Sequence, residues 1–244
     1  MRSSVINVKA TETGKPEKMI EVLHVKKSYG KRRVLEDISF RAMTGERVVI
    51  VGRNGCGKST LLQILAGAIR PDGGNIRYFG TDPLKNRKFF RANCGYVPQE
   101  NPLMEDLSVL DNLRLWGFRK SHPDPVILQQ FGLEDLLNRR VELLSGGMKR
   151  RVSLACAAIA HPPVMLLDEP TTALDICYRE EIRQWMRTYQ QRGGIIVMTT
   201  HEESEIMEAQ HCLVMNGGKL FETADDERDM RHILDMTREE LENE

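Results

Sequence analysis

Short runs of apolar residues alternate along this chain with longer segments in which apolar residues recur every three or four positions. The alternation predicts a parallel sheet with helices packed on its faces, an α/β fold. Three runs, Val48–Val51, Val164–Leu167 and Ile195–Met198, contain no polar residue. Strands without polar alternation are buried on both faces, so we expect these three at the centre of the sheet.

Three other segments, Met19–Val25, Leu35–Phe40 and Asn75–Phe79, mix polar and apolar residues and are typical of half-exposed antiparallel strands. We expect them to form a small antiparallel β annex beside the mainly parallel core. Near the end of the chain, Asn216-Gly217 separates two more β-type runs. This dipeptide suits the positive φ angles of a tight hairpin turn.

The stretch from about residue 100 to 161 carries the boundary signals of several helices. Ser108 with Asp111 forms an N-capping pattern, Asp124-Pro125 begins a helix, and Gly132 ends it. We therefore expect a helical subdomain inserted in the core.

Composition divides the chain into three parts. Residues 1–18 lack an apolar stretch of signal-peptide length, and we expect a mobile tail. Residues 19–222 are expected to form one domain with one large core. Residues 223–244 are rich in Asp and Glu and poor in apolar residues, so a solvated acidic tail is expected there.

Charge and cysteine content exclude several classes of protein. Lys and Arg number 35 and so do Asp and Glu, so no overall field favours nucleic acid. The longest apolar run, Leu154–Ala160, has seven residues, whereas a membrane-spanning helix needs roughly 20, so we expect no direct membrane insertion. The five cysteines form no C-x-x-C pair, which argues against zinc and disulfides.

A phosphate-binding loop is the clearest motif. Residues 52–59, GRNGCGKS, match G-x-x-x-x-G-K-[ST], follow a predicted buried strand and precede a helical pattern. Backbone N–H groups of such a loop surround phosphate oxygens, the Lys58 charge binds the β- and γ-phosphates, and the Ser59 hydroxyl ligates Mg²⁺. A chance glycine turn would not supply all eight positions and both flanking elements. The predicted nucleotide contacts are Asn54, Gly55, Cys56, Gly57, Lys58, Ser59 and Thr60.

Cys56 lies within this loop. A helix N-terminus can lower a thiol pKa, which would make Cys56 reactive and alkylation harmful to ATP binding. The alternative is that a small side chain is simply tolerated at a variable position.

Asp168 and Glu169 end another predicted buried strand. Neighbouring side chains point in different directions at the end of a strand, so the two carboxylates can do different work. Asp168 is predicted to hold the Mg²⁺ shell and Glu169 to orient and deprotonate the attacking water. Alone, the pair could equally begin a turn before Pro170.

Leu144-Ser145-Gly146-Gly147-Met148 precedes the acid pair and closely resembles the signature sequence of the ABC ATPase family. Ser145 is placed to cap a helix, and the glycines would expose its N-terminal amides. From about Ile20 to Phe221 the order of motifs resembles that family. The resemblance implies a P-loop NTPase (RecA-like) core and makes residues 19–222 a single ABC ATP-binding domain.

Further roles follow from the resemblance alone. Tyr29 resembles the aromatic residue that stacks on adenine, and Gln99 resembles the glutamine that contacts Mg²⁺ and water. His201 resembles the histidine that reaches the γ-phosphate. Thr172–Asp175 resembles the loop between the two sites of a dimer, although Asp175 could also cap a helix.

The resemblance also implies a mechanism with partners. Two ATP-binding subunits, identical or different, would close face to face, with Ser145, Gly146 and Gly147 of one subunit contacting the nucleotide of the other. Closure would drive a separate polytopic membrane permease. The chain would then be cytoplasmic and peripheral on the inner face of the cell membrane.

One departure concerns Met148, where the family signature usually has Gln. Met148 removes a hydrogen-bonding side chain but not the helix-end amides. The run Met148–Arg151 resembles the branch of bacterial exporters, which favours export. The alternatives are a soluble ABC ATPase that serves an iron–sulfur assembly scaffold and, with less support, a small-molecule kinase.

Overall fold

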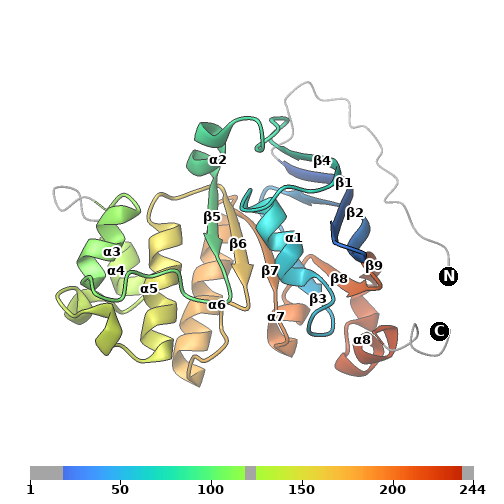
Figure 1. Cartoon of the computed structure of the whole chain (residues 1–244). Coiled ribbons are helices and arrows are strands. Elements are labelled where there is room, and N and C mark those ends of the chain that lie inside the picture. The colour runs from blue at the N-terminus through green and yellow to red at the C-terminus, as the bar shows by residue number, and fades with distance from the viewer. Residues whose placement is uncertain (1–18, 119–124, 238–244) are drawn as a thin grey trace.

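One nine-stranded sheet runs through the described part of this computed structural model, residues 19–118 and 125–237 (Figure 1). In chain order the strands are β1 (Met19–Tyr29), β2 (Arg32–Met43), β3 (Arg47–Val51), β4 (Gly73–Tyr78), β5 (Cys94–Val97), β6 (Val164–Asp168), β7 (Ile195–Thr199), β8 (His211–Asn216) and β9 (Lys219–Thr223). Across the sheet their order is β4-β1-β2-β9-β8-β3-β7-β6-β5. The predicted tail at residues 1–18 lies outside the described residues.

Helices cover both faces of the sheet. The α-helices are α1 (Lys58–Leu65), α2 (Arg87–Asn93), α3 (Val109–Leu115), α4 (Pro125–Gln130), α5 (Gly146–Ala158), α6 (Ile176–Gln191), α7 (Glu203–Met207) and α8 (Met230–Met236). Short 3₁₀ helices cover Glu134–Leu136, Val141–Leu143 and Asp225–Glu227.

The centre of the sheet is parallel and buried, as predicted. Every residue of β3, β6 and β7 is buried, and these strands pair in parallel with one another and with β5 and β8. Side chains alternate between two cores: Val48 and Ile50 pack on the α1 side, and Val49 and Val51 face the core that contains α5 and α6. This alternation explains why the runs Val48–Val51, Val164–Leu167 and Ile195–Met198 contain no polar residue.

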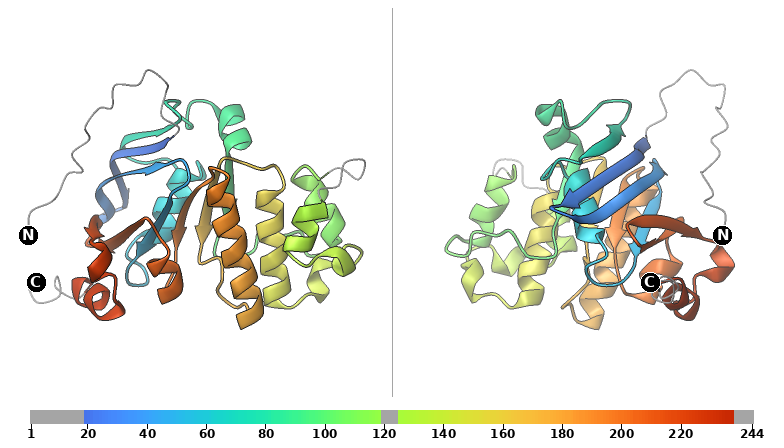
Figure 2. Two further views of the ribbon diagram at one scale, coloured as in Figure 1. Left: turned by 180° about the vertical axis from the view of Figure 1, so that it is seen from behind. Right: turned by 45° about the vertical axis from the view of Figure 1, so that its right-hand side comes forward.

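The predicted antiparallel annex is present as β4, β1 and β2. It is not a separate layer, because β2 pairs in parallel with β9 at Asp37 and Lys219 and so continues the main sheet. Figure 2 shows these strands at the opposite end of the molecule from α3 and α4.

The helical subdomain contains α3, α4 and α5, as predicted. The Ser108 hydroxyl accepts a hydrogen bond from the Asp111 amide at 3.1 Å and caps α3. Gly132 has a φ of 56° and follows α4, which begins at Pro125. Asp124 lies outside the described residues.

The hairpin prediction was wrong by one residue. Asn216 pairs with Lys219, so the turn residues are Gly217 and Gly218, both with positive φ. Two consecutive glycines place the two positive φ angles after Asn216 rather than at it, because glycine has no Cβ to clash there. The Asn216 amide group instead donates to the Met236 carbonyl at 2.8 Å.

The acidic tail is not wholly solvated, which corrects the expectation for residues 223–237. Ile233 of α8 is 4% exposed and belongs to the main core, against which Met230 and Met236 also pack. The Asp229 side chain caps the helix. Three apolar residues on one side of a short helix are enough to attach it to β8.

Within residues 19–118 and 125–237, no helix combines the length and the apolar composition that a membrane span requires.

Candidate functional site

The parallel strands end at a cavity of about 630 Å³. Since β3, β5, β6 and β7 are parallel, the loops after them meet at one edge of the sheet, where α/β proteins bind ligands. The cavity is lined by Tyr29, Arg32, Val34, Asn54, Gly55, Gly57, Lys58, Ser59, Thr60, Gln99, Glu169 and His201. Most residues that the sequence predicted for the nucleotide site therefore lie together.

Lys58 lies at the start of α1 and is 6% exposed. Its ammonium group donates to the carbonyls of Gly52 at 2.6 Å and of Arg53 at 3.1 Å. The loop thus curls around its own lysine, which keeps a cation beside the loop amides. A buried cation at a helix N-terminus is a strong local site for an anion.

Gly57 shows why the loop needs glycine. Its φ is 116°, and an added Cβ would lie 3.0 Å from side-chain atoms of Leu35 and Val34. Any other residue would be strained and would push the loop away from β2. The annex therefore supports the phosphate loop from behind.

Tyr29 and Arg32 form the rim of the cavity on the annex side. The Tyr29 ring is 51% exposed, and the Lys27 ammonium lies 5.5 Å from its centroid. Arg32, which the sequence analysis missed, donates to the Gly55 carbonyl at 3.1 Å. An exposed ring beside the phosphate loop is free to stack on a planar base.

Asp168 and Glu169 do point to different places. Asp168 is buried, does not line the cavity, and accepts a hydrogen bond from the Thr199 hydroxyl at 2.5 Å. Glu169 lines the cavity and has a φ of 50°, and its amide donates to the same hydroxyl at 3.0 Å. Thr199 holds both residues at the end of β6, and the positive φ turns Glu169 out of the strand. A non-glycine residue in this region is strained, and such strain concentrates at functional sites.

His201 approaches Glu169 from the end of β7. Its Nε2 lies 3.5 Å from Glu169 Oε1, while the Thr172 hydroxyl donates to Glu169 Oε2 at 3.2 Å. Both carboxylate oxygens of Glu169 therefore have a neighbour, and the group has a defined orientation toward the cavity.

Arg150 is a second residue that the sequence analysis missed. It is 3% exposed, and its guanidinium donates to backbone carbonyls on both sides of the site, those of Pro98, Gln99, Asp168, Glu169 and Pro170. Burial lowers the pKa of Arg150 to about 10, so the group is still charged at neutral pH.

Glu205 was also missed. This carboxylate is 1% exposed and accepts hydrogen bonds from the hydroxyls of Thr171, at 2.9 Å, and Thr200. Burial raises its pKa. Thr171 follows the Glu169 turn and Thr200 precedes His201, so Glu205 ties the two loops together beneath the cavity.

Cys56 does not behave as the reactive-thiol interpretation requires. It does not line the cavity, and burial raises its thiol pKa although the nearby Lys58 charge acts in the opposite direction. Its side chain packs against the α1 core, and the predicted contact between Cys56 and the nucleotide stays a prediction. Desolvation outweighs the helix N-terminus because the half-buried sulfur faces apolar neighbours.

The signature residues do not line the cavity either. The Ser145 side chain caps α5 by accepting from the Met148 amide at 3.3 Å, as predicted. Ser145 and Gly146 are exposed, and a Cβ added at Gly146 would meet open space. A Cβ at Gly147 would lie 3.2 Å from the Ala173 carbonyl. The start of α5 therefore presents bare backbone to solvent outside the cavity that the phosphate loop lines.

The loop of residues 172–175 packs beside this helix start. Ala173 has a φ of 65°, and the Asp175 side chain accepts from the Tyr178 amide at 3.1 Å. Asp175 is thus the N-cap of α6, as the sequence analysis allowed.

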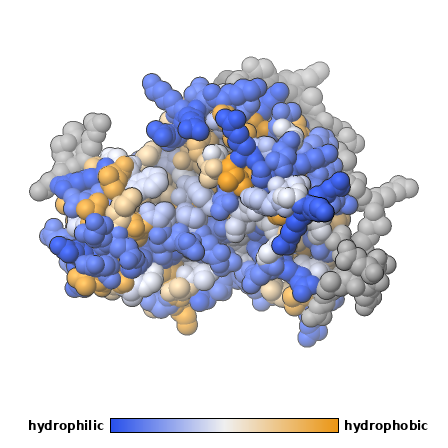
Figure 3. All heavy atoms as spheres, in the orientation of Figure 1, coloured by the Kyte–Doolittle hydropathy of each residue, from blue (hydrophilic) through white to orange (hydrophobic). Residues whose placement is uncertain are grey.

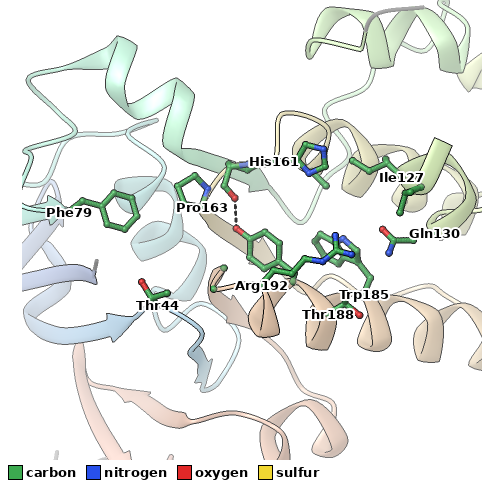
Figure 4. Close-up of a pocket in the computed structure, with 15 residues that line it drawn as sticks. Thr44, Phe79, Ile127, Gln130, His161, Pro163, Trp185, Thr188 and Arg192 are labelled. Carbon is green, nitrogen blue, oxygen red and sulfur yellow. Dashed lines mark hydrogen bonds between the residues drawn. The ribbon is translucent and has the colours of Figure 1, made fainter. Parts of the chain in front are cut away.

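A second cavity, of about 450 Å³, lies at the other end of the parallel strands (Figure 4). It is bordered by Phe79 and Thr44 on one side and by Trp185, Thr188 and Arg192 on the other. None of the predicted site residues lines it.

On the face shown in Figure 3 most of the surface is hydrophilic, with hydrophobic residues in small separate groups.

The residues of the first cavity fit a magnesium nucleotide. A buried cation and helix N-terminal amides suit the phosphates, and the Ser59 hydroxyl and the Gln99 amide supply the oxygen ligands that Mg²⁺ prefers. Among the described residues there is no cluster of three or more His, Cys, Asp or Glu side chains able to hold a metal by themselves.

Fold and site together define a P-loop nucleoside triphosphatase. The family model described as ABC transporter matches residues 35–172, and the chain belongs to the ABC transporter family. It is the ATP-binding, ATP-hydrolysing subunit of a transporter of the exporter type, as its motifs predicted.

Two proteins with similar sequences have names that refer to export. A protein named Nod factor export ATP-binding protein I from Paraburkholderia xenovorans is 40% identical over 218 residues, 86% of this chain and 72% of the relative. Its namesake from Rhizobium meliloti is 38% identical over 217 residues, 85% of this chain and 65% of the relative.

Solved structures agree with this assignment. An ATP-binding subunit of an ABC transporter matches with a TM-score of 0.80 at 28% identity, over 92% of this chain and 99% of that chain. A dimeric cassette in a post-hydrolysis state with ADP and Pi matches with a TM-score of 0.75 at 26% identity, over 84% of this chain and 98% of that chain. An ATP-bound bacterial Atm1-family ABC exporter matches with a TM-score of 0.80 at 26% identity, over 92% of this chain and 42% of that chain. The non-transport alternative is not favoured.

Proposed function

We propose that this chain hydrolyses Mg²⁺-ATP in a site completed by a second ATP-binding subunit, and that closure of the pair drives export through a separate membrane permease. One observation carries the proposal. Glu169 and His201 face the phosphate loop across one cavity, whereas Ser145 and Gly146 are exposed outside it. Each subunit thus presents two half-sites on different parts of its surface.

The binding roles follow from position and chemistry. Tyr29 stacks on the adenine base, and the loop amides of residues 54–60 with the Lys58 ammonium hold the phosphates. Ser59 and Gln99 ligate Mg²⁺, and Asp168 acts from behind them, because its carboxylate is buried beneath the cavity. When bound, Mg²⁺ neutralises charge on the phosphate oxygens.

Hydrolysis uses Glu169 as the general base. Its carboxylate accepts a proton from water as the water oxygen bonds to the γ-phosphorus and the bond to the β–γ bridging oxygen breaks, which leaves ADP and phosphate. His201 orients the carboxylate and contacts the γ-phosphate. Lys58 stabilises negative charge on the phosphoryl oxygens.

The second subunit supplies Ser145, Gly146 and Gly147. Ser145 and Gly146 are exposed and Gly147 is partly buried, and the amides at this helix end suit the phosphoryl oxygens of a nucleotide bound to the facing subunit. Because ATP contacts both subunits only in the closed pair, its binding favours closure, and hydrolysis releases it.

Size-exclusion chromatography with light scattering tests the composite site. Glu169→Gln is expected to bind ATP without turning it over, and it should therefore shift from monomer to dimer when ATP is added. Adding Ser145→Arg to this variant should keep it monomeric while fluorescent-ATP binding stays within about threefold. If the double variant dimerises as well as Glu169→Gln, the signature half-site is wrong.

The permease would contact the helical subdomain. Met104, Leu115 and Trp116 are exposed there at 54%, 63% and 47%. Such contact would place the chain on the inner face of the cell membrane as a peripheral subunit. Isolation from native membranes in detergent should yield a polytopic partner that stimulates ATP turnover. A soluble scaffold protein in its place would support the non-transport alternative.

A further inference from the structure

Arg150 and Arg151 are adjacent on α5, and both are 3% exposed. Two neighbouring buried arginines need many acceptors, because an unpaired buried guanidinium is very costly. Their acceptors lie in different parts of the molecule. This difference separates a role in the site from a role in the subdomain.

Among the described residues, Arg151 contacts the segment after α4 and Tyr178 of α6. Its Nη1 donates to the carbonyls of Phe131 and Gly132 at 3.2 Å each, and its guanidinium lies 3.7 Å from the ring centroid of Tyr178. None of these residues lines the nucleotide cavity.

Arg150 reaches the turn that carries the proposed base. Its Nη2 donates to the carbonyls of Asp168 and, at 3.0 Å, of Glu169, and its Nε donates to that of Pro170 at 3.2 Å. Three consecutive carbonyls thus converge on one planar group. A rigid fork of donors fixes such a turn better than a flexible ammonium could.

The other side of the same guanidinium reaches the loop after β5. Nη1 donates to the Pro98 carbonyl at 2.5 Å and to the Gln99 carbonyl at 3.4 Å, and it lies 3.5 Å from Asn101 Oδ1. One side chain therefore joins the backbone of Glu169 to the backbone of Gln99.

Glu169 needs such support because its backbone has a φ of 50°. A strained conformation persists only when its surroundings hold it. Ser145, the exposed cap of α5, lies little more than one helical turn before Arg150. A rigid helix therefore connects the signature end directly to the guanidinium.

We propose that Arg150 is a positioning residue, which holds Glu169 and Gln99 in register and transmits movement of the signature end of α5 to both. The inference rests on the proposed roles of those two residues. It predicts that loss of the guanidinium misplaces the attacking water while ATP binding, which depends on the phosphate loop, is preserved.

The test compares Arg150→Gln with Arg151→Gln, matched for residue type, burial and helix. Steady-state ATP turnover, fluorescent-ATP affinity and the melting temperature are measured for each. Arg150→Gln should lower kcat by about 10- to 100-fold with affinity within about threefold, because small misplacement of a catalytic group is costly. Arg151→Gln should lower the melting temperature but keep kcat, assayed where it is folded, within about threefold.

A double-mutant cycle separates positioning from general weakening. Glu169→Gln should lower kcat by a much smaller factor in the Arg150→Gln background than in wild type. In the Arg151→Gln background it should lower kcat by the same factor as in wild type. Equal costs in all three backgrounds, or an unchanged kcat in Arg150→Gln, would overturn the proposal. If Arg150→Gln does not fold, Arg150→Lys is put through the same cycle with the same criteria. If Glu169→Gln costs nothing in wild type, it is the proposed function that fails.

Discussion

His201 Nε2 and Glu169 Oε1 lie 3.5 Å apart, at the carboxyl ends of the neighbouring parallel strands β7 and β6. Residues 32 positions apart are brought together by strand pairing alone, since Thr199 is in register with Asp168. The relationship gives the carboxylate a fixed partner on the side that faces the phosphate loop. It is the core of the proposed hydrolytic site.

Lys58 is predicted to be essential for nucleotide affinity. Lys58→Met should weaken fluorescent-ATP binding by about 10- to 100-fold, because a charged group that donates hydrogen bonds to phosphate contributes about 1.5–3 kcal/mol. Lys219→Met, which removes a half-exposed lysine of β9, is the control and should bind ATP as the wild type does. Equal affinity of the two variants would contradict the phosphate-binding role.

Cys56 is predicted to be a slow target for alkylation. Burial raises its thiol pKa, whereas Cys177 at the start of α6 is exposed. Since the thiolate and access both govern the reaction, N-ethylmaleimide should modify Cys177 at least about tenfold faster near neutral pH. Peptide mass spectrometry over time measures both rates in one sample. Faster labelling of Cys56 would restore the reactive-thiol interpretation.

A charged cluster around His211 predicts a pH dependence of stability. His211 Nδ1 lies 2.6 Å from Glu222 Oε1, and Nε2 lies 3.4 Å from Glu46 Oε2. The hydrogen bonds with Glu222 and Glu46 raise the His211 pKa from 6.5 to about 9 and lower the pKa of both carboxyl groups below 4.5.

A raised histidine pKa stabilises the fold fully below pH 6.5, and the contribution is lost as pH rises through about 9. The carboxylates contribute above about pH 4.5, and their contribution is lost as pH falls through their lowered values. The melting temperature of wild type should therefore exceed that of His211→Gln most between about pH 5 and 6.5, and the gap should close by about pH 10. A gap that widens toward alkaline pH would contradict this assignment.

The central strands and the phosphate loop could be predicted because local pattern determines them. A wholly apolar run such as Val48–Val51 is typical of a strand that is buried on both faces, at the centre of a sheet. The loop motif occurs between a strand and a helix, so its place in the fold is also determined locally. The hairpin was misplaced because Gly218 can adopt positive φ as readily as Gly217. The role of α8 was missed because attachment by Ile233 depends on a surface that exists only after folding.

Arg150 shows what sequence pattern cannot supply. Its acceptors lie about 20 and about 50 positions away in the chain and are backbone carbonyls, which have no residue-type signature. In the sequence it is one basic residue among three, Lys149 to Arg151, and only its burial distinguishes it from an exposed charge. Glu205 escaped notice for the same reason, since its two threonine donors come from different loops.

The most direct test of the account is the ATP turnover number of Glu169→Gln beside wild type and beside Glu202→Gln, which alters a nearby carboxylate paired with Arg179. Removal of a positioned general base should lower kcat by about 10²- to 10⁴-fold, with ATP affinity unchanged. Glu202→Gln should keep kcat within about threefold. Wild-type turnover by Glu169→Gln, with ATP still bound, would contradict the mechanism at its centre.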